Sequence, residues 1–503
     1  MSQTIDRRQF QKRLTAALAA TAVLPLGCET RSPASEAPVS SGDKIPEGGS
    51  GILSVTRGAP VLTVPEVMPE GARWRYGLIL PFQAGPYTGG AFVNVRIRNG
   101  VMGHKSGHGD YEVGNDVVLF DSVDGIRPGS TLNLHRNHDE PNPHSDPPGQ
   151  TSIMVKYPMR GGFVPLGAKT ASGADHPGAG TGFGVSLALA RRKKGPDHPD
   201  GAEYSQEENY QYFEVFQLSF DGERMRRTDV QRFRPESMVE GWWIYNGGLA
   251  NAIPSGDDLL LCVSAAASKG GDGYDPRVPG GSGVLRWSRQ GGRWQPESFV
   301  MVTGADSSSE ASLIRDLDGS LLFAARPGPQ DFHSIRVWRS QDEGRSWKKI
   351  IDVRGGISIA PITLNQAVDG TPYIASNIYL VPTHPIDKRF RTIRDHQGRV
   401  RGGGWTRQKL YLWPLNQERT GLEAPIPARD CRAEFGPPPG DSMWRVDHPF
   451  AANLHLGDGN WHNVMGYRIH EDVEDHDAVL PPETGSYLEE VISAGPPIPA
   501  WIF

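Results

Sequence analysis

The chain has 503 residues, a net charge of −6 at neutral pH and only three cysteines. The acidic balance argues against nucleic acid as a partner, because proteins that bind nucleic acid carry clustered excess basic charge. Three cysteines cannot build a disulfide framework. The 61 glycines and 42 prolines are spread along the chain, and no long segment keeps a helical periodicity. An all-β protein made of short strands and turns is therefore expected.

An export signal is expected at the N-terminus. Residues 6–28, DRRQFQKRLTAALAATAVLPLGC, hold paired arginines, a short apolar stretch and a cysteine, in that order. The stretch is too short for a membrane span. The order resembles a twin-arginine signal that ends in a lipoprotein box, with Cys28 as the lipidated residue. This predicts a signal at 1–27, a flexible tether at 28–51 and one folded domain at 52–503, exported and held at a membrane only through its lipid.

After lipidation, two cysteines remain. Cys262 and Cys431 could form one disulfide in an oxidising compartment or stay as two buried thiols, and the sequence leaves both open.

A turn motif recurs along the chain. Residues 120–129, 218–225 and 286–294 carry degenerate versions of it, and residues 340–347, SQDEGRSW, carry a complete version. The irregular spacing fits four-stranded blades with loop insertions. At ~75 residues per blade, the folded domain suits a six-bladed β-propeller, with seven blades as the alternative.

The complete motif has a physical explanation as a strand that ends in a turn. The preceding run, HSIRVW, alternates in the manner of a strand. Asp342 can accept backbone N–H bonds in the turn, Gly344 can adopt a positive φ, and Trp347 can bury a large surface at the start of the next strand. The octapeptide, with Ser340 at its start, matches the Asp-box (BNR repeat) of the sialidase-like β-propellers. The chain therefore resembles that superfamily.

The resemblance implies a catalytic blade around residues 307–328. Glu310 precedes an apolar strand, a D-G turn follows, and Arg326 ends the next strand. In sialidases this order belongs to the blade whose Glu activates a nucleophilic Tyr and whose Arg binds the substrate carboxylate with a planar fork of donors. A structural ion pair between Glu310 and Arg326 is the alternative.

The resemblance extends to both ends of the domain. Near the start, Arg96 or Arg98 corresponds to another carboxylate-binding arginine, and Asp110, with Asp116 as the alternative, corresponds to the general acid. The family motif R-I-P reads RIR here, which leaves the choice of arginine open. Arg468 corresponds to the third arginine and Tyr487 to the nucleophile, although Tyr487 also fits a core position.

Two long loops are expected to carry function, one rich in His and Pro at 135–150 and one rich in Gly at 169–184. Their His and Asp residues could form a metal site or supply a general base, but no tight ligand spacing occurs, so neither a metal nor a cofactor is expected. Ordinary loop hydrogen bonds are the default interpretation. The residues concerned are His135, His138, His144, His176, Asp139 and Asp146.

Aromatic residues cluster in EGWWIYNGG. Trp242 and Trp243 are adjacent on a predicted strand and so point to opposite faces, which leaves one of them for a sugar ring and one for the core. We assign Trp243 to the ligand. Tyr245 is a second candidate for the catalytic tyrosine.

Three functions follow, in decreasing order of support. The first is an exo-glycosidase that hydrolyses an acidic sugar, with the arginines above as its carboxylate clamp. The second is a lyase for uronate-containing polysaccharide, which would use His108, His135 or His138 with Tyr245 and an arginine. The third is a non-catalytic propeller that binds glycan or protein. The sequence identifies neither the sugar nor the oligomeric state.

Overall fold

The structure is a computed structural model. It describes residues 53–56, 60–62, 73–84, 87–98, 110–122, 125–136, 152–156, 164, 170, 172–192, 204–220, 225–234, 238–268, 280–304, 307–327, 334–354, 361–377, 407, 409–436, 444–471 and 485–498.

The described strands form six antiparallel sheets, which we number in chain order. Sheet 1 holds β3 (Arg73–Ala84), β4 (Tyr87–Arg98), β5 (Asp110–Ser122) and β6 (Gly125–Arg136). Sheet 2 holds β7 (Ser152–Lys156), β8 (Thr181–Arg192), β9 (Tyr204–Phe220) and β10 (Met225–Phe233). Sheet 3 holds β11 (Trp242–Gly247), β12 (Ile253–Ser255), β13 (Asp258–Ala267), β14 (Gly281–Gln290) and β15 (Arg293–Met301).

The second half of the chain repeats the pattern. Sheet 4 holds β16 (Ser307–Arg315), β17 (Leu321–Pro327), β18 (Ser334–Ser340) and β19 (Lys348–Arg354). Sheet 5 holds β20 (Ile362–Gln366), β21 (Pro372–Ser376), β22 (Lys409–Pro414) and β23 (Ile426–Asp430), followed by the short helix α3 (Cys431–Phe435). Sheet 6 holds β24 (Trp444–His455), β25 (Trp461–Glu471) and β26 (Gly485–Ser493), joined by β1 (Leu53–Val55) and β2 (Pro60–Leu62).

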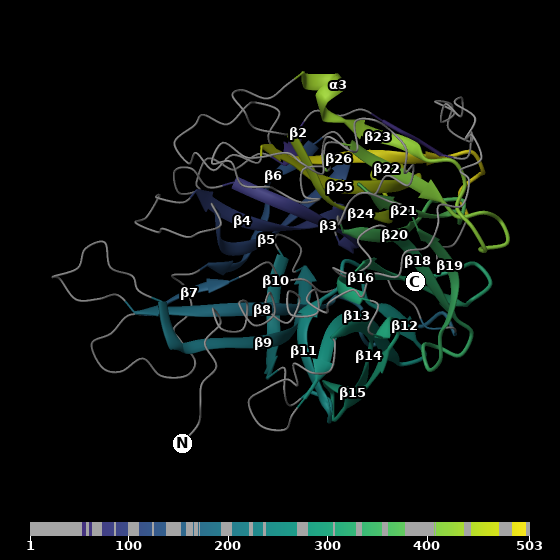
Figure 1. Ribbon diagram of the computed structural model, residues 1–503. Helices are drawn as coiled ribbons and strands as arrows, with labels where there is room; N and C mark the ends of the chain where they lie inside the picture. The colour runs from purple at the N-terminus through teal and green to yellow at the C-terminus, as the bar shows by residue number, and fades with distance from the viewer. Residues whose placement is uncertain are drawn as a thin grey trace, which may run out of the picture.

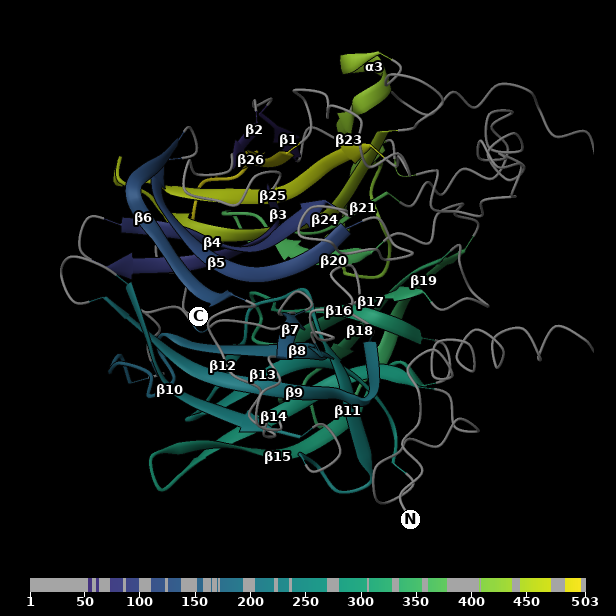
Figure 2. The same ribbon diagram turned by 90° about the vertical axis from the view of Figure 1, so that its left-hand side faces the viewer.

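The sheets are arranged as a propeller (Figures 1 and 2). Each sheet contacts the next along the chain, and sheet 6 contacts sheet 1 through β24 and β3. The first strand of each sheet lies at a sheet edge, and the first strands of sheets 3 to 6 contact one another in sequence, so these strands line the centre. The N-terminal strands β1 and β2 pair with β26, which ties the two ends of the domain together. The predicted all-β propeller is confirmed.

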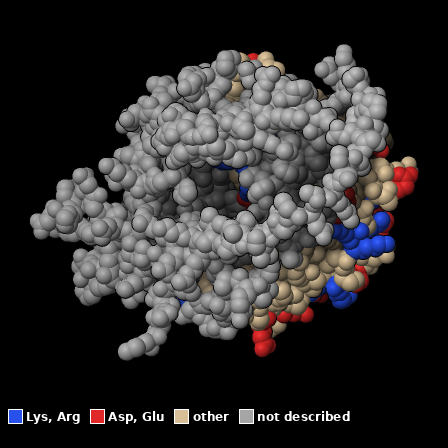
Figure 3. All heavy atoms as spheres, in the orientation of Figure 1, with Lys and Arg blue, Asp and Glu red and all other residues tan. Residues whose placement is uncertain are grey.

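The antiparallel order gives the propeller two different faces. In sheet 4, short turns join the first strand to the second at 316–320 and the third strand to the fourth at 341–347. We call this end the turn face. The opposite end, where the first strands begin and the second strands finish, is the loop face. Figure 3 shows one face of the molecule, with basic and acidic atoms visible near its centre.

Aromatic side chains fill the space between sheets 2 and 3. Trp287 is fully buried, and its ring centroid lies 5.2 Å from that of Phe183 and 5.4 Å from that of Phe213. Each sheet has two faces that it cannot bury alone, so the packing of neighbouring sheets supplies the core. Cys262 and Cys431 are also buried, and both are free thiols. The alternative of two buried thiols is therefore the one found.

The turn at 340–347 of sheet 4 has the local bonding that its sequence predicts. Ser340 Oγ donates to Asp342 Oδ1 at 2.8 Å and accepts from the Gly344 N–H at 2.9 Å. The other carboxylate bonds come from Ser346, whose N–H and Oγ donate at 2.8 and 2.5 Å, and these bonds lower the pKa of Asp342 to about 2. Gly344 has a φ of 80°. Trp347 Nε1 donates to the Gly344 carbonyl at 3.0 Å.

We expect Asp342→Ala to destabilise the fold by ~1–3 kcal/mol, because the Ser346 N–H and the hydroxyls of Ser340 and Ser346 lose their acceptor. Catalytic or binding activity should not change, since the turn lies away from the loop face. The free energy of unfolding from urea denaturation checks this. Gln341→Ala, at an exposed position of the same turn, is the matched control and should stay close to wild type. Equal stability of the two variants would contradict the structural role of the carboxylate.

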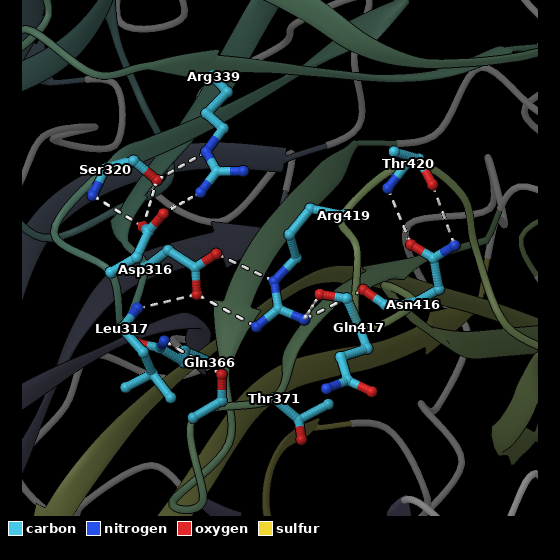
Figure 4. Close-up of polar contacts among 12 residues, drawn as sticks. Asp316, Leu317, Ser320, Arg339, Gln366, Thr371, Asn416, Gln417, Arg419 and Thr420 are labelled. Atoms are coloured by element: carbon cyan, nitrogen blue, oxygen red, sulfur yellow. Dashed lines mark hydrogen bonds and ion pairs between the residues drawn. The ribbon is translucent and has the colours of Figure 1, made fainter.

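Side-chain hydrogen bonds and ion pairs on the turn face also connect neighbouring sheets. Glu343, next to Asp342, accepts from Arg315 of β16 at 2.7 and 2.8 Å and from Ser255 of β12 at 2.7 Å. Between sheets 4 and 5, Asp316 accepts from Arg419 Nε at 2.9 Å and from Nη2 at 3.3 Å (Figure 4). These bonds join sheet 3 to sheet 4, and sheet 4 to sheet 5, at the turn face.

Candidate functional site

Glu310 stands at an irregular point of the central strand of sheet 4. The pairing of β16 with β17 shifts between Ser307 and Ala311, which marks a β-bulge, and Glu310 within it has a φ of 69°. A positive φ is costly for a residue with a side chain, and such outliers gather at functional sites. Bulges also redirect side chains. The Glu310 side chain is nevertheless buried, at 2% exposure for the residue.

The carboxylate of Glu310 contacts the arginine that the sequence paired with it. Arg326 Nη1 lies 2.6 Å from Glu310 Oε2, and 23% of the Arg326 side chain is exposed. The two residues come from neighbouring strands at the loop-face end of sheet 4. The structure therefore brings together the predicted Glu310 and Arg326.

A histidine that the sequence did not single out completes the cluster. His448 Nε2 lies 3.5 Å from Glu310 Oε1, and the His448 side chain is 11% exposed. His448 also has a positive φ, 51°, within an irregularity of β24 between Asp447 and Phe450. Pro449 follows it, and proline inside a strand-like run indicates a bulge, which is the signal that could have drawn attention to this position.

The position of this contact in the ring follows from topology. Glu310 belongs to sheet 4 and His448 to sheet 6, and sheet 5 lies between them. Both residues are on first strands, which line the centre. Side chains from two sheets that are not neighbours can meet there, so the Glu310–His448 contact places the cluster in the central region at the loop-face end.

The cluster has the components of an acid–base centre. A carboxylate beside an imidazole can orient the ring and stabilise its protonated form, and an adjacent guanidinium can bind an anionic group. The separation of 3.5 Å is longer than a strong hydrogen bond. Catalytic hydrogen bonds are often long before substrate binds.

Arg468 and Tyr487, the two site residues predicted near the C-terminus, lie in different surroundings. Arg468 is 5% exposed on β25, and its backbone pairs with Asp447, the neighbour of His448. Tyr487 lies on the third strand of sheet 6, is 1% exposed, and stacks on Tyr467 with 5.5 Å between ring centroids and 3° between planes. The Arg429 guanidinium lies 5.0 Å from the Tyr487 ring. This is the core position that the sequence left as the alternative to the nucleophile.

The tryptophan pair lies at the start of β11, the first strand of sheet 3. Trp242 packs edge-on against Phe299, with 4.9 Å between ring centroids, and joins the core of sheets 2 and 3. Trp243, which faces the opposite way, is partly exposed. Trp242 is partly exposed as well, so burial does not separate the two rings, and the assignment of Trp243 to a ligand stays a prediction. The side chain of Tyr245 lies outside the described part of the structure.

For the first sheet the structure gives backbone pairing only. Arg98 pairs with Asp110 and Arg96 with Glu112 across β4 and β5, and His135 pairs with Asn115. Arg98 and Asp110 therefore share the loop-face end of sheet 1. The side chains of these residues and of Asp116 lie outside the described residues, as do His108, His138, Asp139, His144 and Asp146 altogether.

His176 from the Gly-rich loop has a structural role. It is 2% exposed, its Nδ1 accepts the Gly178 N–H at 3.0 Å, and its Nε2 lies 2.9 Å from the Gly256 carbonyl. Burial lowers the pKa of His176, which favours the neutral ring that this bonding needs. Among the residues that the structure describes, no group of three His, Cys, Asp or Glu residues is arranged to hold a metal ion.

Comparisons with known proteins find similarity only among solved structures, at low sequence identity. No protein-family model matches the sequence, and no curated protein matches it. Among solved structures, a protein of unknown function from Dyadobacter fermentans is similar, with 13% identity and a TM-score of 0.46 over 87% of this chain and 98% of that one. Trypanosoma rangeli sialidase in complex with the inhibitor DANA is similar at 13% identity and a TM-score of 0.44, over 87% of this chain and 59% of that one.

A mutant of NanB sialidase from Streptococcus pneumoniae is similar at 10% identity and a TM-score of 0.45, over 86% of this chain and 70% of that one. The chain thus spans less than two thirds of the Trypanosoma rangeli enzyme. At these identities and scores, the similarity assigns no activity to the chain.

Proposed function

We propose that this protein is a carbohydrate-active enzyme that cleaves a glycan containing an acidic sugar, with Glu310, His448 and Arg326 as its reaction centre. The observation that carries the proposal is the Glu310–His448 contact, made by two residues with positive φ on central strands of sheets 4 and 6. In this proposal each of the six sheets is one blade of a sialidase-like propeller.

The reaction that this arrangement supports best is elimination at a uronate. Arg326 binds the sugar carboxylate and stabilises the charge that develops on it. His448, oriented by Glu310, removes the proton at C5, the C4–O bond breaks, and the electron pair of the C5–H bond becomes the C4–C5 double bond. The departing C4 oxygen takes a proton from water. The histidine in contact with Glu310 favours this reaction over the hydrolase that the sequence placed first.

Hydrolysis of an acidic glycoside is the second candidate. It is supported by the order and pairing of Glu310 and Arg326 at the end of one hairpin. Asp110 would be the general acid in this reaction. The burial of Tyr487 weighs against it as the nucleophile, which leaves Tyr245 for that role.

Arg326→Lys tests the proposal. Lysine keeps the charge but cannot make two parallel bonds to a carboxylate, so we expect kcat/KM to fall about 30- to 1000-fold. The assay should use sialosides, other acidic glycosides and uronate polymers. Reducing ends with ultraviolet absorbance of an unsaturated product support elimination, and reducing ends without that absorbance support hydrolysis.

A matched control is available at the other end of the same sheet. Arg315 has a similar exposed fraction, 26% against 23%, and pairs with Glu343 on the turn face. Arg315→Lys should leave kcat/KM unchanged. If the wild-type protein cleaves no substrate in the panel but binds acidic glycan equally well with Lys at position 326, the enzyme proposal is wrong and a binding propeller remains.

We also propose that the protein is exported and anchored to a membrane through lipid on Cys28. The support is the order of the paired arginines, the apolar stretch and the cysteine in the sequence. Among the described residues, no helix is long and apolar enough to cross a membrane. We expect Cys28→Ala to move the protein from the membrane fraction to the soluble fraction. Recovery of that variant entirely with membranes would contradict the anchor.

A further inference from the structure

We propose that buried hydrogen bonds of Ser312, Thr363 and Asn365, which we call the relay, fix how far the central strands of sheets 4, 5 and 6 are displaced along one another. The relay thereby holds Glu310 against His448. These three are positioning residues. The inference rests on the proposed role of the Glu310–His448 pair, but its test below needs no substrate.

The need for such a relay arises from the position of the central strands. Each first strand pairs with only one other strand of its sheet, so half of its backbone N–H and C=O groups face away from that partner. When buried, these groups must find other acceptors and donors. The partners that they find determine how far one central strand is displaced along the next.

The first link joins sheets 4 and 5. The N–H of Leu364 on β20 donates to Ser312 Oγ on β16 at 2.6 Å, and Ser312 is fully buried. Ser312 stands two residues after Glu310 and directly after the bulge. The position of β20 along the strand direction is therefore fixed relative to a point close to the Glu310 carboxylate.

The second link joins sheets 5 and 6. The N–H of Ala451 on β24 donates to Asn365 Oδ1 on β20 at 2.9 Å, and Asn365 is 1% exposed. Asn365 is itself oriented, because its Nδ2 donates to the carbonyl and to the Oγ1 of Thr363, at 3.2 Å in each case. Ala451 stands three residues after His448. The two links thus connect the strand of Glu310 to the strand of His448 through β20.

β16 is also fixed from its other side. The carbonyl of Ala311, the residue after Glu310, accepts the N–H of Leu249, in the connection between β11 and β12, at 2.6 Å and the thiol of Cys262 on β13 at 3.2 Å. A strand advances about 3.3 Å per residue. A slip of one residue between the central strands would therefore separate the Glu310 carboxylate from the His448 ring.

The test uses the ring NMR signal of His448 in the full-length protein at a fixed pH, identified by its loss in His448→Gln. Glu310→Gln should displace this signal and so defines the effect of removing the carboxylate. Asn365→Ala should displace it in the same direction. Ser312→Ala should do the same, and Ser312→Thr, which keeps the Oγ acceptor, should restore the wild-type position.

Tyr373→Phe is the matched control. The Tyr373 hydroxyl donates to Asn463 Oδ1 at 2.6 Å, so this variant also loses one buried hydrogen bond between sheets 5 and 6, but on their second strands. It should leave the His448 signal in place. Melting temperatures of all variants separate a general loss of stability from a change at the site, and Ser312→Ala keeps the test open if Asn365→Ala fails to fold.

Two results would overturn the relay. One is an unchanged His448 signal in both Asn365→Ala and Ser312→Ala while Glu310→Gln displaces it, or an equal displacement in Tyr373→Phe. The other is an unchanged signal in Glu310→Gln, because the contact that the relay positions would then be absent in solution. Failure of the glycan assays leaves this test unaffected, so the relay and the proposed function can fail separately.

Discussion

Replacing Glu310 by Gln should lower kcat/KM on the acidic glycan by about 10²- to 10⁴-fold, the range that a positioned acid–base group contributes. Glutamine keeps the size of the side chain but cannot take up a proton or stabilise a protonated His448. The pairing of Arg326 with the carboxylate should also weaken, because a neutral amide attracts a guanidinium less strongly. Steady-state kinetics with the substrate found in the panel measures this effect.

The control and the coupled variant make the result specific. Glu343→Gln removes an arginine-paired carboxylate on the turn face and should leave kcat/KM unchanged. His448→Gln should lower kcat/KM about as much as Glu310→Gln, and the double variant should be little worse than either, because groups that act as a unit are not additive. Full activity in Glu310→Gln would show that Glu310 is not part of the reaction centre.

The second large effect concerns stability. Arg419→Ala should lower the free energy of unfolding by ~3–5 kcal/mol, because it leaves the carboxylate of Asp316 buried without its cation. Asp316 is 6% exposed and accepts two bonds from the Arg419 guanidinium (Figure 4). Arg419 has a φ of 59°, but alanine also carries a Cβ, so the backbone cost is the same before and after the change. Denaturant unfolding measures the loss.

An exposed ion pair provides the comparison. Lys409 Nζ lies 2.6 Å from Asp430 Oδ2, and the two side chains are 51% and 25% exposed. Lys409→Ala should change the free energy of unfolding by only ~0–1 kcal/mol, because water screens and replaces an exposed pair. Similar losses in Lys409→Ala and Arg419→Ala would show that the Asp316–Arg419 pair is not a fastening between sheets 4 and 5.

The turn at 340–347 and the Glu310–Arg326 pair show what can be inferred from local sequence. The bonds made by the side chains of Ser340, Asp342 and Trp347 lie within eight consecutive residues, so residue types and spacing are sufficient to predict them. Glu310 and Arg326 stand at the open end of a single hairpin, and its tight turn fixes their pairing.

The sequence by itself therefore determined the all-β architecture, the turn chemistry and the contacts within one hairpin, because these depend on short-range geometry. Only the tertiary structure decided which distant residues share the centre. His448 reaches Glu310 because the ring of sheets brings β24 opposite β16, and Tyr487 is buried because β25 and β26 stack it on Tyr467. His176, predicted as one of several loop histidines, forms a hydrogen bond with the Gly256 carbonyl of the next sheet. The Glu310–His448 contact depends on the arrangement of the sheets in a ring, and the other two depend on strand pairing within sheet 6 and on the packing of sheet 2 against sheet 3. Residue spacing along the chain encodes none of these.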